Sequence, residues 1–220
     1  MTLDTRADIP RRRLSAGERR ETILGAALDV FARHGYQGAS IDEIAQAAGI
    51  SKALIYEHFP SKKELHISLL ETHVGELFAR MVATTTMGDT PEARLRSGVG
   101  AVFAFVAEHR EAWRLLFRDA VEPDVAERLQ AVQGQATALI AQMMAADPDV
   151  PAGLDAEREV AVEMYAQQLS GAVQALANWW LDHPDVARET LVDRVVDFTF
   201  TGMERVREAQ LAPRGSAELG

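Results

Sequence analysis

Donor groups that can bond phosphate oxygens and the edges of DNA bases are concentrated in residues 51–62. Lys52, Tyr56 and His58 lie within a stretch of seven residues, and Lys62 follows shortly after. Ammonium, phenol and imidazole groups of this kind contact both the DNA backbone and the base edges in its grooves. The segment therefore predicts a recognition helix. Its exposed surface would comprise Lys52, Ala53, Tyr56, Glu57 and His58.

Two predicted helices hold this segment in place. Ser40 and Glu43 have the S-x-x-E spacing of a capping box, which opens the first of them. Gly49 ends that helix and permits a sharp turn, because glycine adopts the left-handed conformation at little cost. Ser51 can then cap a second helix running to Phe59. The pair predicts a helix-turn-helix, whose second helix enters the major groove. The residues expected to pack its two helices together are Ile44, Ala45, Ala48, Ile50 and Ile55.

The rest of the chain also carries helical signals, with no strand-like alternation of useful length. Ser15 and Glu18 form another capping box, Gly35 ends the first helix, and Asp185 is placed as the N-cap of the last. The expected helices span about 15–35, 40–49, 51–59, 62–84, 91–107, 111–117, 123–146, 156–182 and 186–209. We therefore predict an all-α protein of about nine helices. Its parts are a disordered basic arm (1–14), a helix-turn-helix DNA-binding domain (15–60), a larger helical domain that we expect to dimerise (61–210) and a disordered tail (211–220).

Two consecutive runs resemble the tetracycline-repressor-like (TetR) family of transcriptional regulators. They are ILGAALDVFARHGYQGAS at 23–40 and IDEIAQAAGISKALIYEHFPSKKEL at 41–65. The part around WWLDHPD, between two long predicted helices, is similar to the family much less specifically. The resemblance implies a ligand-responsive regulator, most often a repressor, that binds a palindromic operator as a homodimer.

The same resemblance implies roles for individual residues. Lys52, Ala53 and Leu54 would begin the recognition helix, where base contacts arise, and Ser51 would cap it. The residues implied to bond backbone phosphates are Ser40, Tyr56, His58 and Lys62. Family members often carry a small polar pair where this chain has Ala53-Leu54, so one expected polar contact is absent; Leu54 either meets a thymine methyl group or is buried. Two further alternatives stay open: Tyr56 as a partly buried core residue, and residues 11–13 as a solvated arm or a phosphate or minor-groove contact.

A second group of residues could line a ligand cavity. Helical spacing alone favours an ordinary core for them, and the cavity is implied by the resemblance. The effector would be small and apolar or aromatic, with Asn178 among the polar groups that could orient it. The candidate ligand-binding residues are Phe103, Trp113, Phe117, Met143, Met164, Tyr165, Gln168 and Trp179.

Charge, composition and hydrophobic pattern indicate where the protein resides and how it assembles. The net charge of −10 comes from residues 65–220, since residues 1–64 carry ten Lys and Arg against nine Asp and Glu. No cysteine, membrane-spanning run or signal peptide is evident, so we expect a cytoplasmic protein. The last two long helices each need two buried faces, which predicts a homodimer through them.

A rival interpretation is an enzyme or ligand-storage protein on a helical bundle, suggested by the aromatic and methionine content and the acidic charge. Against it, no phosphate-binding loop or nucleophile elbow is present, so we expect no catalytic residues, cofactor or membrane partner. His66 and His73 are seven residues apart but show no third ligand in the sequence, so we expect no metal site.

Overall fold

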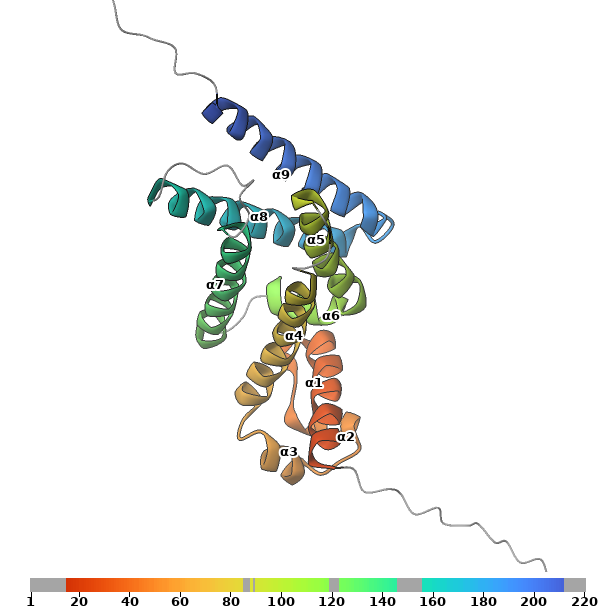
Figure 1. The fold of residues 1–220 in the computed structure, drawn as a ribbon. Helices are drawn as coiled ribbons and strands as arrows, with labels where there is room; N and C mark the ends of the chain where they lie inside the picture. Colours follow the sequence, from red (N-terminus) through yellow and green to blue (C-terminus); the bar gives the residue numbers. More distant parts are fainter. Residues whose placement is uncertain (1–14, 85–87, 89, 119–122, 146–155, 212–220) are drawn as a thin grey trace, which may run out of the picture. The chain divides into compact units, whose positions relative to one another are not determined.

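The computed structural model describes residues 15–84, 88, 90–118, 123–145 and 156–211. Over these residues the chain forms nine α-helices and no strand, which confirms the all-α prediction (Figure 1). The predicted arm (1–14), nearly all of the predicted tail (211–220) and the loop before residue 156 lie outside the described residues. Across the described ranges, no helix is long and apolar enough to cross a membrane. The helices are α1 Ala16–Gly38, α2 Ile41–Ala48, α3 Lys52–His58, α4 Lys62–Thr84, α5 Pro91–Glu108, α6 Arg110–Phe117, α7 Pro123–Ala145, α8 Ala156–Asp182 and α9 Arg188–Leu211.

Two compact units divide the described chain between Leu69 and Leu70. The division falls later than the expected boundary at residue 60, so the first two turns of α4 belong to unit 1. The reason is burial: Leu65 and Leu69 are almost fully enclosed, and the His66 ring packs edge-on against Phe31 with centroids 5.0 Å apart. An apolar face of this kind stays with the core that buries it.

The helix starts of unit 1 follow its serine caps. Ser15 with Glu18 and Ser40 with Glu43 form complete capping boxes, in which side chains bond backbone N–H groups in both directions. The Ser61 hydroxyl accepts from Glu64 N at 3.1 Å at the start of α4. Gly35, with φ 68° and ψ 169°, interrupts α1 where a helix end was predicted. These local signals therefore predicted the boundaries that position α2 and α3.

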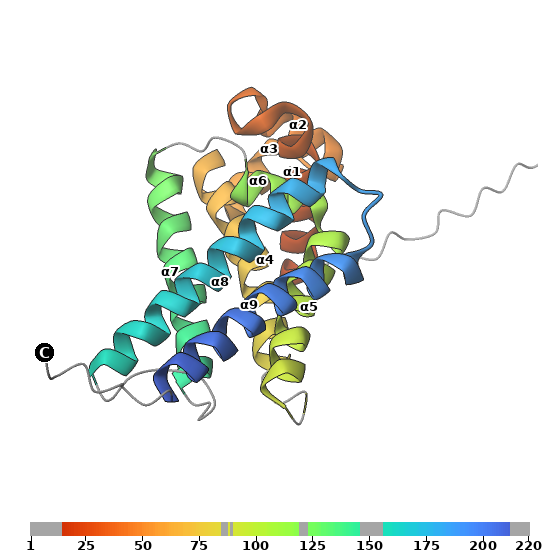
Figure 2. The ribbon, with the colours of Figure 1, turned by 90° about the horizontal axis from the view of Figure 1, so that it is seen from above.

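The core of unit 2 is built by the later helices packing in pairs. α5 packs on α9 and α7 on α8, while α8 and α9 lie side by side (Figure 2). The rings of Phe103 and Trp180 meet edge to face with centroids 5.9 Å apart, and Arg96 of α5 pairs with Asp193 of α9. These contacts bring six helices, α4 to α9, around one apolar interior.

The start of α9 corrects one expectation. The helix begins at Arg188, so Asp185 lies before it in the turn and is not its N-cap. The turn is held instead by the indole of Trp180, which donates to Val186 O at 2.8 Å. A buried side chain of α8 therefore fixes the turn where a local polar cap was expected.

Candidate nucleic-acid interface and ligand cavity

The turn between α2 and α3 is a closed hydrogen-bonded motif. Gly49 is left-handed (φ 66°, ψ 33°), and its N–H donates to Gln46 O while Ile50 N donates to Ala45 O. This pair of bonds is the Schellman arrangement, which satisfies the last carbonyls of a helix and reverses the chain direction. The angle between the two short helices is thus fixed by backbone chemistry that requires a glycine at position 49.

α3 has one buried side and one exposed side. Ile55 is fully buried and Phe59, which follows the helix, is 1% exposed. On the opposite side Tyr56 is 45% exposed, and Leu54 and His58 are half-buried. Leu54 is thus neither fully buried nor fully free to meet a thymine methyl. The residues of α3 that face solvent are Lys52, Ala53, Tyr56 and Glu57.

The Lys52 ammonium lies at the outer surface in an ion pair. Its Nζ is 2.9 Å from Asp42 Oδ2 of α2, and both side chains are largely exposed. The hydrogen bond to Asp42, together with its charge, raises the pKa of Lys52. The cation is therefore held at the start of α3 by the preceding helix, in a pair that solvent screens.

The two serines expected near phosphate already serve as caps. Ser40 Oγ donates to Glu43 Oε2 at 2.8 Å, and Ser40 N donates to the same oxygen at 2.9 Å. These two hydrogen bonds hold the pKa of Glu43 below its usual value. Ser51 Oγ accepts from Leu54 N at 3.3 Å and is exposed. A phosphate contact by either hydroxyl stays a prediction, to be made in addition to the capping bond.

The Lys62 ammonium is already hydrogen-bonded inside unit 1. Its ammonium donates to Tyr36 O at 2.8 Å and to Ala39 O at 3.1 Å, and lies 4.5 Å from the centroid of the Tyr36 ring. These carbonyls belong to the corner between α1 and α2. Its implied role at a phosphate stays a prediction, and in this structure the side chain ties the start of α4 to that corner.

Unit 2 contains a cavity of about 580 Å³ with a largely apolar lining. This volume lies in the range of pockets that hold small molecules. Among the predicted ligand residues, Trp113, Phe117 and Met143 lie at its wall. The lining from α4, α5 and α6 is Val74, Leu77, Phe78, Met81, Pro91, Arg94, Leu95, Gly98, Val99, Val102, Trp113 and Phe117. The lining from α7, α8 and α9 is Ala136, Leu139, Ile140, Gln142, Met143, Met144, Leu169, Ser170, Val173, Gln174, Phe200 and Met203.

The other predicted ligand residues lie outside that lining. Phe103 is fully buried in the core against Trp180. Met164 and Trp179 are 56% and 44% exposed, Gln168 is exposed and Tyr165 is half-buried. Helical spacing shows which residues share a face, but the neighbouring helices decide whether that face meets a cavity, a core or solvent.

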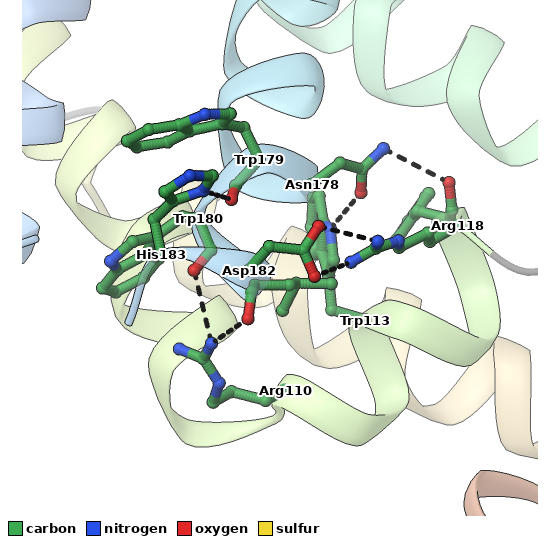
Figure 3. Close-up of polar contacts among 10 residues, drawn as sticks. Arg110, Trp113, Arg118, Asn178, Trp179, Trp180, Asp182 and His183 are labelled. Atoms are coloured by element: carbon green, nitrogen blue, oxygen red, sulfur yellow. Dashed lines mark hydrogen bonds and ion pairs between the residues drawn. The ribbon is translucent and has the colours of Figure 1, made fainter. Parts of the chain in front are cut away.

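Polar side chains join α6 to the end of α8, beside Trp113 of the cavity lining (Figure 3). The Trp113 indole donates to Asn178 Oδ1 at 2.9 Å, and the Asn178 amide donates to Phe117 O at 3.4 Å. Arg110 donates to Leu181 O at 2.9 Å, and Arg118 pairs with Asp182 at 2.7 Å. Asn178, expected to orient a ligand, thus holds α6 against the end of α8.

Sequence reasoning missed the polar groups of the cavity wall. They are Arg94, Gln142, Ser170 and Gln174, contributed by α5, α7 and α8. They carry no motif, and nothing in their local sequence distinguishes them from surface residues. Only the arrangement of the helices places them at the cavity.

Unit 1 contains a helix-turn-helix with an exposed second helix, and unit 2 is a larger all-helical unit with its own cavity. This combination is typical of DNA-binding transcriptional regulators. Residues 23–69 match the family described as "Bacterial regulatory proteins, tetR family", and residues 91–202 match "Tetracyclin repressor-like, C-terminal domain". The chain belongs to the TetR family of transcriptional regulators, as its helix-turn-helix residues suggested.

Relatives and solved structures agree with this assignment. The chain is 34% identical to the HTH-type transcriptional activator FasR of Mycolicibacterium smegmatis over 88% of its length and 87% of the relative's. It is 32% identical to the HTH-type transcriptional repressor SCO4008 of Streptomyces coelicolor over 76% and 80%.

Two solved structures share the fold. A TetR-like regulator from Rhodococcus sp. RHA1 superposes with a TM-score of 0.72 at 24% identity, covering 87% of this chain and 99% of that one. FadR from Bacillus subtilis in complex with stearoyl-CoA gives a TM-score of 0.71 at 19% identity, covering 83% and 98%.

Proposed function

We propose that the protein is a homodimeric, ligand-responsive regulator that binds a palindromic operator through α3. The observation that carries this proposal is the solvent-facing side of α3, which is fixed from behind by Ile55 and Phe59 and from the side by the Gly49 turn. A rigid helix presented outward in this way fits the width of the DNA major groove.

A mobility-shift titration tests operator binding. The probe is the DNA flanking the protein's own coding region, with a shuffled duplex of equal length as control. We expect saturable binding to one palindromic segment, weakening steeply as salt rises because phosphate contacts release counterions. Equal affinity for both duplexes, or none in dilute salt, would contradict operator recognition.

The dimer surface is proposed on α8 and α9. Large apolar side chains stand exposed there, with Phe198 80% exposed and Trp179 44% exposed beside a shallow groove that also includes Leu176 and Val195. Exposed apolar patches of this kind mark association surfaces. We expect Phe198→Asp to convert a dimer to a monomer in sedimentation, while Val82→Asp, an exposed site on α4, leaves the dimer intact.

The effector is proposed to be a long apolar molecule such as a fatty acyl group. The apolar lining and the volume of the cavity support it. FadR from B. subtilis, which has the same fold, was solved with stearoyl-CoA, so this fold can accept an acyl group. The test is release of the operator duplex, or its tighter binding, on adding acyl-CoA of increasing chain length, with free coenzyme A as control.

The sign of regulation is a separate question. The resemblance to the TetR family implies a repressor, whereas the M. smegmatis relative, which matches most of the chain, is named an activator. Deleting the gene and measuring the transcript next to the operator distinguishes the two, because loss of a repressor raises that transcript and loss of an activator lowers it. The expected cytoplasmic location stays a prediction.

A further inference from the structure

Two histidines and a glutamate from separate stretches of unit 2 meet at one point. His73 and Glu76 are three residues apart on α4, so they lie on the same helical face. His109 stands at the junction of α5 and α6, and its Nε2 lies 3.2 Å from Glu76 Oε1. One ligand atom from each of the three residues lies within 4.8 Å of the others. We propose that His73, Glu76 and His109 form a binding site for a divalent transition-metal ion, with Zn²⁺ as the type ion.

The donor set selects the kind of ion. Two imidazole nitrogens and one carboxylate oxygen suit Zn²⁺ and its neighbours in the first transition row, whereas Mg²⁺ and Ca²⁺ prefer sites made of oxygen alone. Three protein ligands leave one tetrahedral position for water. Across the part of the chain that the structure describes, no other group of three histidine or acidic side chains has this spacing.

The His73 ring offers a buried donor nitrogen to an ion. His73 Nδ1 is buried and has no hydrogen-bond partner among the described residues. A neutral imidazole and an ionised carboxylate are the metal-binding forms.

Arg80 is the group that an incoming ion must displace. Its guanidinium pairs with Glu76 Oε1 at 2.6 Å and also with Glu108 Oε2 at 2.6 Å. Glu108 therefore offers Arg80 a second carboxylate to keep when Glu76 turns to the ion. Glu108 Oε2 is itself 4.0 Å from His109 Nε2, which adds negative charge beside the site. The exchange replaces a monovalent cation at Glu76 by a divalent one and keeps Arg80 paired with Glu108.

The His109 ring is already held in place. It packs on Phe105 with ring centroids 4.7 Å apart, and its centroid lies 5.3 Å from that of His73. A preorganised ligand loses little conformational freedom on binding. An ion here would join α4 to the α5–α6 junction within unit 2 and stabilise the folded unit by mass action.

The test uses the full chain, prepared with no added polyhistidine segment. A chromophoric chelator loaded with Zn²⁺ competes with the protein, and thermal unfolding is followed with Zn²⁺ and with Mg²⁺. We expect one equivalent of Zn²⁺ to move to the protein and raise the Tm, with no effect of Mg²⁺ at the same concentration. Glu76→Gln and His109→Gln should each weaken Zn²⁺ binding by roughly tenfold or more, since even supporting partners of metal ligands are worth that much. His183→Gln, at the exposed end of α8, is the matched control and should bind as the unmodified protein does.

Several results would overturn the proposal. They are failure of the unmodified protein to take Zn²⁺ from the chelator, equal response to Mg²⁺, or unchanged affinity in both Glu76→Gln and His109→Gln. Should these variants not fold, nitrogen-detected NMR of the histidine rings in the unmodified protein decides. Zn²⁺ must then shift the His73 and His109 signals and leave those of His183, and any other pattern excludes the site.

Discussion

At the scale of single residues, the exposed side of α3 combines a cation held in an ion pair with an aromatic ring that is partly exposed. Lys52 is paired with Asp42, whereas the Tyr56 ring stands 45% exposed at the surface. An exposed ion pair is weak because solvent screens it, so a DNA phosphate can compete for the ammonium. Asp42 thus holds the Lys52 ammonium at the surface and leaves it able to bind a DNA phosphate.

Replacing the acidic partner should strengthen DNA binding. In Asp42→Asn we expect the dissociation constant for the operator to fall by roughly two- to fivefold, because the loss of a weak, exposed ion pair frees the ammonium for a phosphate. Fluorescence anisotropy at fixed salt measures it. In a Lys52→Met background the gain should vanish; a gain that persists there would mean that Asp42 acts only by repelling DNA.

The phenol oxygen of Tyr56 provides a second test at this scale. Tyr56→Phe keeps the ring and removes one hydrogen-bonding group, so operator affinity should fall by about 1 kcal/mol, roughly fivefold. The Tm should stay unchanged because the side chain faces solvent. Wild-type affinity would contradict the assigned phosphate contact and leave Tyr56 as a partly buried ring of unit 1.

At the scale of elements, local residues determine where α2 and α3 begin and end. The start of α4 has a local cap at Ser61 and is also anchored by a long-range contact of Lys62. Capping serines and Gly49 could be identified from the sequence because their partners lie within four residues. The anchoring of Lys62 could not, since its two carbonyl partners are 26 and 23 residues away. The same holds for Glu76 and His109, 33 residues apart. Spacing on one helix reports which side chains share a face, and packing between helices decides what that face meets.

Lys62→Met should therefore destabilise unit 1. The substitution keeps the apolar stem, removes the donor from two carbonyls and loses the contact with the Tyr36 ring. We expect a loss of about 1–3 kcal/mol in unfolding free energy, measured by urea denaturation. Lys63→Met serves as the neighbouring control. The salt dependence of operator binding then separates the two roles, since a lost phosphate contact lowers its slope by about one.

At the scale of the whole molecule, the cavity makes effector binding separable from stability. Gly98 lies at the cavity wall in α5, and among the described residues a Cβ there would have Thr84 Oγ1 as its one neighbour within 4 Å, at 3.9 Å. Gly98→Leu should fill part of the space and improve helix propensity by up to about 1 kcal/mol. We expect at least a tenfold loss of acyl-CoA affinity in calorimetry with no fall in Tm. Gly100→Leu, on the same helix but outside the lining, should bind the effector normally.

The indole N–H of Trp113 is bonded to Asn178, so this ring offers a molecule inside the cavity only its hydrocarbon surface. Where the wall is apolar, as at this ring, the affinity for a ligand depends on the length of the chain that contacts it. Each methylene brought into contact is worth about 0.8 kcal/mol, or roughly fourfold in affinity, until the space is full. Within a homologous series of ligands, affinity would therefore rise with chain length, and the protein would respond most strongly to the longest chain that still fits.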